Sequence, residues 1–187
     1  MANREAPAQL SKRSHSLRGL ALAAGALSAG VFLVNGCGNS ELTSYVADDG
    51  RYEVLMPRPV RTEVRTGPAG ERIDLLHYER HDGAFGVVHK QSPISVYESE
   101  SDLRKRLEDN RSWVFQGERG TITSETRLLL QEKWPGRKLE GKLPNNVRFR
   151  ARLYLADGRL YQLIVIGKPS WVFSKDATRF LESFAVR

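Results

Sequence analysis

Cys37 is the only cysteine of this 187-residue chain, and its thiol is the most distinctive reactive group in the sequence. A lone thiol cannot close a disulfide within the chain, and a single sulfur makes a poor metal site. Cys37 stands directly after an N-terminal segment that is first positively charged and then apolar. This placement indicates that the chemistry at Cys37 is the attachment of a lipid.

The segment before Cys37 has the parts of a secretory signal. Residues 1–19 hold four basic residues and one acidic residue, and residues 20–34 carry no charge. About twenty apolar residues are needed to span a bilayer, so this stretch is short for a permanent helix. The ending Leu33-Val34-Asn35-Gly36-Cys37 resembles the lipobox of bacterial lipoproteins, in which the signal is cut before a cysteine that carries the lipid. The alternative is cleavage elsewhere, which would leave Cys37 as a free thiol.

Cleavage before Cys37 divides the chain into three parts. Residues 1–36 are the removed signal, residues 37–50 the lipidated cysteine and a short tether, and residues 51–187 a single domain. Losing four of 29 basic and one of 22 acidic residues leaves 25 and 21, so the net charge falls from +7 to +4. Basicity therefore gives no argument for nucleic acid as a partner.

The same features predict a location. We expect the domain in a bacterial cell envelope, in the periplasm or outside, held on a membrane by the lipid on Cys37. Gly38 follows the cysteine where sorting of well-studied lipoproteins to the inner membrane uses Asp, which favours the outer membrane.

Three histidines within thirteen residues, His77, His81 and His89, are the candidate metal ligands. Residues 72–80 and 84–91 are expected to form a hairpin around Asp82-Gly83. In that register His77 and His89 point to opposite faces, and His77 lies about 13 Å from His81 along the strand. The spacing favours ordinary strand and turn histidines, and we expect no metal and no cofactor.

A second hairpin, around Asp157-Gly158, gives the best candidate for binding. Its register sets Tyr154 opposite Tyr161 and places alternate arginines in a row on the same face, while the other face is the more apolar core surface. The strip would suit an anionic lipid, a glycan or an acidic envelope protein; the alternative is a solvated face whose arginine stems cover apolar neighbours. Its members are Arg148, Arg150, Arg152, Tyr154 and Tyr161.

Regular elements cover most of the expected domain. Helical periodicity predicts helices over residues 101–115 and 175–184, with Ser101 and Ser174 as N-caps. Together with the strands, the two helices indicate an α+β fold with a largely antiparallel sheet flanked by helices. The expected strands are residues 51–56, 60–66, 72–80, 84–91, 121–131, 133–143, 147–156 and 159–167.

Several runs resemble a group of small bacterial lipoproteins, found often in planctomycetes, that have a PsbP/Mog1-like domain. The resemblance is clearest from Trp134 onward and implies an antiparallel sheet sandwiched by helices. The group offers no activity or catalytic residues to transfer. The runs are Trp134-Pro135-Gly136-Arg137, residues 150–155, 158–165 and 174–184, and the opening strand at residues 50–57.

The residues downstream of Cys37 form no catalytic pattern. The chain has no Gly-x-Ser-x-Gly elbow, and no nucleophile, base and orienting group can be named together. We therefore expect a non-enzymatic, membrane-anchored envelope lipoprotein with a binding or scaffolding domain. A carrier of an apolar or lipid-like ligand is the first alternative, and a hydrolase is the second.

Overall fold

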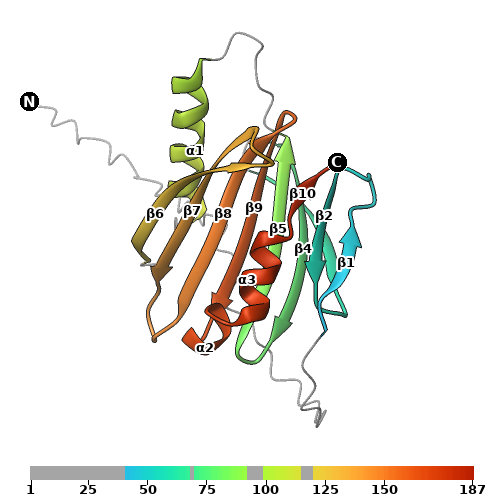
Figure 1. Ribbon diagram of the computed structural model, residues 1–187, viewed down its shortest axis with the longest axis vertical. Coiled ribbons are helices and arrows are strands. Elements are labelled where there is room, and N and C mark those ends of the chain that lie inside the picture. Colours follow the sequence, from blue (N-terminus) through green and yellow to red (C-terminus); the bar gives the residue numbers. More distant parts are fainter. Residues whose placement is uncertain (1–40, 68–69, 92–98, 115–119) are drawn as a thin grey trace, which may run out of the picture.

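A seven-stranded antiparallel sheet forms the centre of the molecule (Figure 1). The computed structural model describes residues 41–67, 70–91, 99–114 and 120–187, so the predicted signal and Cys37 lie outside the described residues. The strand order is β3-β4-β5-β9-β8-β7-β6. The strands are β3 (Arg61–Thr66), β4 (Arg72–Arg80), β5 (Gly83–Gln91), β6 (Thr121–Leu130), β7 (Trp134–Lys142), β8 (Arg148–Ala156) and β9 (Arg159–Gly167).

A small sheet of order β1-β2-β10 lies beside the large one (Figure 1). It is built from β1 (Thr43–Val46), β2 (Tyr52–Met56) and β10 (Ala185–Val186), all antiparallel. The predicted tether of residues 37–50 therefore contains a strand, and the folded part begins before residue 51. Neither β1 nor β10 is expected from the sequence, because both are too short to show a clear alternation.

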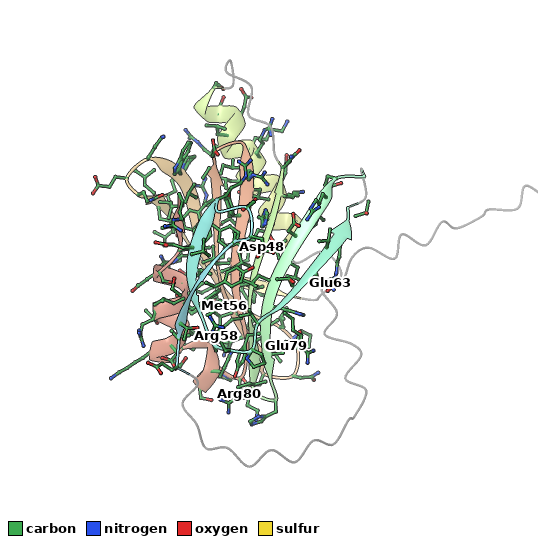
Figure 2. The ribbon with its side chains drawn as sticks, turned by 90° about the vertical axis from the view of Figure 1, so that its right-hand side faces the viewer. Asp48, Met56, Arg58, Glu63, Glu79 and Arg80 are labelled. Carbon is green, nitrogen blue, oxygen red and sulfur yellow. The ribbon has the colours of Figure 1, made fainter. Side chains whose placement is uncertain are left out.

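Helices cover both faces of the large sheet (Figures 1 and 2). The helix α1 (Glu100–Val114) packs against β7 and β8. The short helix α2 (Pro169–Val172), which the sequence does not predict, and α3 (Lys175–Glu182) lie on the opposite face together with β2. Because the central strands β8 and β9 are covered on both faces, thirteen of their eighteen residues are buried.

Two cores result from this layering. The first lies between the sheet, the small sheet and α3, and the second lies under α1. Principal residues of the first are Tyr52, Met56, Phe85, Tyr154, Tyr161, Leu163, Phe180 and Phe184. Principal residues of the second are Leu107, Leu139, Phe149, Leu153, Leu155, Leu160 and Ile164.

Side-chain caps fix where the helices begin. The Ser99 hydroxyl accepts a hydrogen bond from the Asp102 backbone N–H at 3.3 Å, and the Asp102 carboxylate accepts one from the Ser99 backbone N–H at 3.0 Å. This reciprocal pair is a capping box, so Ser99 rather than the predicted Ser101 caps α1. The predicted cap of α3 is confirmed, since Ser174 accepts from the backbone N–H of Ala177 at 3.1 Å.

The two hairpins differ in how they follow the sequence. The β8–β9 register is as predicted, with Tyr154 opposite Tyr161. The β4–β5 register is shifted by two residues, because Arg80 faces Gly83 and the turn is made by His81 and Asp82. A shift of two preserves the faces of a strand, so His77 and His89 still point to opposite sides.

None of the helices in the described ranges has the length and apolar character needed to cross a membrane.

Candidate functional site

The predicted arginine and tyrosine strip is not an exposed surface. Tyr154 and Tyr161 are 1% and 0% exposed and belong to the core under α3. The expectation that this face of the β8–β9 hairpin is open to solvent is wrong, because α2, α3 and the small sheet cover it. The sequence does not predict the elements that cover this face, because β1, β10 and α2 are all short.

The arginines of the strip connect the sheet to the helices above it. Arg150 is 8% exposed, and its guanidinium donates to the Thr178 hydroxyl at 3.0 Å and lies 3.5 Å from the Glu140 carboxylate. Arg152 lies 3.4 Å from the Glu182 carboxylate on α3. Arg148 is half-buried at the start of β8 and has no hydrogen bond or ion pair in the described part of the chain. Arg150 and Arg152 thus have structural partners.

The three histidines lie in three different environments. His77 is near the Glu79 carboxylate at 3.3 Å, and His81 is exposed in the β4–β5 turn. His89 is buried on the opposite face from His77, with Nε2 3.9 Å from Asp74 Oδ2. Within the described ranges, no group of three His, Cys, Asp or Glu side chains is arranged to hold a metal ion.

A polar cleft lies between the β1–β2 turn and the ends of β3, β4, β5 and β9. It has a volume of about 410 Å³, and Figure 2 shows Asp48 on the turn and Glu63 on β3, which line its two sides. Its walls carry both charged and aromatic groups. Residues that line it include Tyr45, Asp48, Asp49, Arg51, Tyr52, Glu63, Arg72, Asp74, His89, Gln91 and Arg159.

The sheet side of the cleft is a block of polar side chains set by strand register. His89 on β5 faces Tyr161 on β9, and Gln91 faces Arg159 on the same two strands. Asp74 on β4 faces His89 from the other side. Residues two apart on a strand share a face, so these five side chains lie together where the apolar core ends.

Aromatic rings enclose His89. The ring of Tyr52 meets those of His89 and Tyr161 edge-on, with centroids 5.4 and 5.8 Å apart. Burial lowers the pKa of His89, while the nearby Asp74 carboxylate acts in the opposite direction. Burial also raises the pKa of Tyr52 and of Tyr161. The floor of the cleft is therefore neutral and apolar beneath a charged rim.

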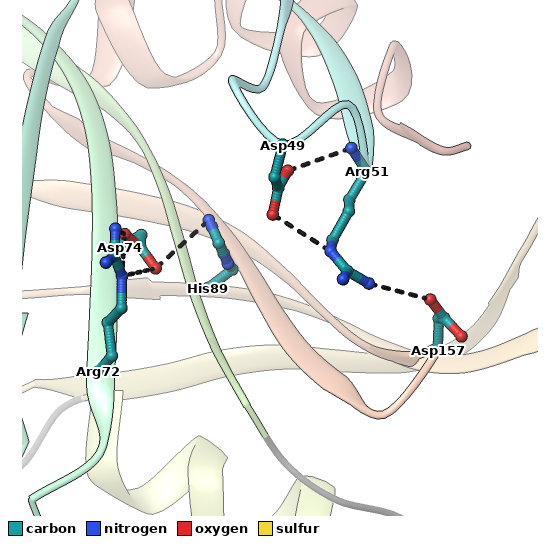
Figure 3. Close-up of polar contacts among 6 residues, drawn as sticks. All are labelled: Asp49, Arg51, Arg72, Asp74, His89 and Asp157. Atoms are coloured by element: carbon teal, nitrogen blue, oxygen red, sulfur yellow. Dashed lines mark hydrogen bonds and ion pairs between the residues drawn. The ribbon is translucent and has the colours of Figure 1, made fainter.

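The charged rim is largely paired (Figure 3). Arg51 lies 3.3 Å from Asp49 and 3.7 Å from Asp157. Arg72 donates to Asp74 at 2.7 Å, and this hydrogen bond is the main cause that lowers the pKa of the Asp74 carboxyl. The Arg51–Asp157 pair joins the β1–β2 turn to the β8–β9 turn, whereas the Arg72–Asp74 pair lies within β4.

A second groove runs between α1 and the β6–β7 edge, with a volume of about 240 Å³. Its apolar lining includes Leu103, Leu107 and Leu129, of which Leu129 is 61% exposed. Arg137 is buried beside it and lies 3.2 Å from Glu125.

The fold was compared with those of known proteins. No family model and no curated protein matches the chain. The chain is similar to the solution structure of cyanobacterial PsbP (CyanoP) from Synechocystis sp. PCC 6803, with a TM-score of 0.58 and 16% sequence identity over 82% of this chain and 97% of that chain. The chain has a PsbP-like fold. The antiparallel, sheet-rich part of the predicted architecture is thereby confirmed.

A weaker similarity adds nothing to the functional argument. A crystal structure of a protein of unknown function from Pseudomonas aeruginosa has a TM-score of 0.39 and 7% identity over 74% of this chain and 90% of that chain. At these identities a shared fold says nothing about chemistry, which depends on the residues of each site.

The sequence reasoning missed the cleft because its walls come from distant segments. A change from apolar to polar residues along the strands could have pointed to the cleft. On their core faces, β4, β5 and β9 carry apolar residues and then, toward one end of the sheet, the polar residues Asp74, His89 and Arg159. Polar residues that interrupt a core-facing row at adjacent strand ends indicate a site at that end of the sheet.

Proposed function

We propose that the chain is an exported lipoprotein, held on an envelope membrane by a lipid on Cys37, and that its domain binds a ligand or partner in the polar cleft without catalysing a reaction. Export and attachment to a membrane are supported by the charged and then apolar segment that ends at the lone cysteine. The observation that carries the binding function is the cleft itself, whose lining includes the buried polar side chain of His89.

The direction of β1 supports a membrane anchor at one end of the domain and a binding cleft at the other. Thr43, at the end of β1 nearer to Cys37, pairs with Met56, whereas Val46 pairs with Glu53 next to the cleft. The chain therefore enters the domain at one end of β1 and reaches the cleft at the other, and Arg58 and Arg80 mark the entry end (Figure 2). A domain tethered this way turns its cleft from the membrane toward the envelope space.

The alternative of an apolar carrier finds less support. A carrier needs open apolar space between the helices and the sheet. The rings of Phe85 and Phe180 stack there at 5.0 Å, and those of Tyr154 and Phe184 stack at 5.8 Å. Side chains thus fill the layer between α3 and the sheet.

The anchor is tested by metabolic labelling of cells with a fatty-acid analogue. We expect the wild-type protein to take up label and fractionate with membranes, and Cys37→Ser to lose both properties. Equal labelling of the two proteins would rule out the lipid on Cys37.

The binding role is tested by photocrosslinking in intact cells. A photoreactive amino acid at position 48 stands on the exposed wall of the cleft, and one at position 173 stands on exposed Phe173 at the other end of the sheet. We expect a discrete adduct from position 48 and none of the same mass from position 173. Identical adduct patterns at the two positions would contradict a binding role for the cleft.

A further inference from the structure

The cleft contains a polar group that the folded chain leaves without a partner. Nδ1 of His89, which lines the cleft, is buried and has no hydrogen-bond partner among the described residues. His89 is 7% exposed. Buried polar atoms are nearly always hydrogen-bonded, so an unpartnered atom on a side chain of the cleft wall indicates a place where something else binds.

Two charged side chains of the cleft have no ion pair within the described ranges, namely Asp48 on the exposed β1–β2 turn and Arg159 at the start of β9. Arg51 is engaged by Asp49 and Asp157, and Arg72 by Asp74. The Glu63 carboxylate accepts two hydrogen bonds from Arg65, at 2.8 and 2.9 Å. Arg159 lines the cleft half-buried, and within the described ranges its guanidinium makes no hydrogen bond or ion pair.

Strand register brings Arg159 close to the unpartnered group. Arg159 and Tyr161 are two residues apart on β9 and share its cleft face, and His89 and Gln91 do the same on β5. Directly opposite side chains have Cβ atoms about 5 Å apart, so the four form a compact square. The positive charge of Arg159 also acts on both neighbours: it opposes the burial that raises the pKa of Tyr161 and adds to the burial that lowers the pKa of His89.

These groups match an oxyanion. A guanidinium presents several N–H donors in a planar fork that fits the two oxygens of a carboxylate or phosphate, and a neutral imidazole can donate one more hydrogen bond. The low polarity of the ring-lined floor strengthens charge-assisted hydrogen bonds to such a group. The same floor leaves room beside the anion for an apolar part of the ligand.

We propose that the cleft binds the carboxylate or phosphate of a small anionic ligand, with Arg159 as the charge partner and His89 as the hydrogen-bond partner. This inference rests on the proposed binding function and adds the chemical class of the ligand.

The test is a titration of the full chain, purified in a neutral detergent, with sodium phosphate and separately with sodium succinate, against sodium chloride of equal ionic strength. Binding is read from the rise of the unfolding midpoint with ligand concentration and from the apparent Kd. We expect at least one of the two oxyanions to stabilise the protein above chloride, and the stronger one identifies the oxyanion.

Variants assign the effect to the site. Arg159→Gln should weaken binding of the better oxyanion about tenfold or more. The matched control is Arg148→Gln, which removes the same charge from a half-buried, unpaired arginine at the opposite end of the same hairpin and should bind as the wild type does. No response above chloride, or equal weakening by Arg159→Gln and Arg148→Gln, would overturn the inference.

The two proposals fail separately. A discrete crosslink from position 48 together with no oxyanion response would support the proposed binding function and refute the proposed class of ligand. An oxyanion response without any crosslink would refute a binding partner at the cleft in cells and support the proposed class of ligand.

Discussion

At the scale of single residues, the core-facing row of the sheet changes character where it reaches the cleft. Further along β5 and β9 this face is apolar, and at the cleft it carries His89 and Tyr161 in positions that leave polar atoms buried and unsatisfied. A site of this kind costs stability in the free protein, about 1–3 kcal/mol for each unsatisfied group. We infer that His89 serves binding, whereas Tyr161 is part of the core.

His89 makes the stability of the domain depend on pH. Burial lowers its pKa in the folded state, so the unfolded chain binds a proton below about pH 6.5 while folded His89 stays neutral. Stability from this residue is therefore complete above about pH 6.5 and falls as the pH drops toward the folded-state pKa. Urea unfolding between pH 7.5 and 5.5 should show a smaller loss in His89→Gln than in the wild type.

The control for this experiment is His81→Gln, which changes an exposed histidine in the β4–β5 turn. It should keep the wild-type pH dependence. If His89→Gln and the wild type lose equal stability over this range, His89 does not resist protonation in the fold.

Glycines show why the sequence predicts one hairpin turn at its observed place and the other one residue away from it. Asp157 and Gly158 both have positive φ, 47° and 67°, as their turn requires, so the Asp-Gly signal is correct there. In Asp82-Gly83 the glycine lies in β5, where a Cβ would collide with the Trp171 ring and the Ile166 carbonyl oxygen. Gly83 is thus required for packing between distant segments, which no local pattern reveals.

At the scale of elements, α3 is the element that turns the predicted strip into a core. Its buried face holds Ala177, Phe180 and Leu181, as the sequence periodicity predicts. The same periodicity gives no information about which sheet face receives the helix. In the β8–β9 hairpin the sequence correctly predicts that the more apolar face is core. It predicts the second face to be surface because the covering elements β1, β10 and α2 are too short to be recognised.

The start of α3 depends on one hydrogen bond. Ser174 accepts from the backbone N–H of Ala177 at 3.1 Å, and Asp176 adds a negative charge in the first turn. Ser174→Ala should lower the free energy of unfolding by about 1 kcal/mol. Denaturant unfolding checks this value against Ser170→Ala, an exposed serine on α2 that should change it little. A loss equal to that of the control would mean that the cap contributes nothing.

At the scale of the whole molecule, the fold places the chain's entry and its cleft at different ends of the small sheet. The α+β class, the second hairpin and the cap of α3 follow from local patterns in the sequence. The cleft does not, because it needs β3, β4, β5 and β9 to meet the β1–β2 turn, and those contacts link residues far apart in the chain. A PsbP-like fold supplies the frame, and the residues of the cleft give it its chemistry.

We propose that the domain, anchored through Cys37, holds an anionic ligand or partner in this cleft through Arg159. The most direct measurement is the yield of the photocrosslinked adduct from position 48 in intact cells, compared among the wild type, Arg159→Gln and Arg148→Gln at equal protein levels. We predict that Arg159→Gln loses most of the adduct and that Arg148→Gln keeps it. Equal adduct yields in all three proteins would contradict the account.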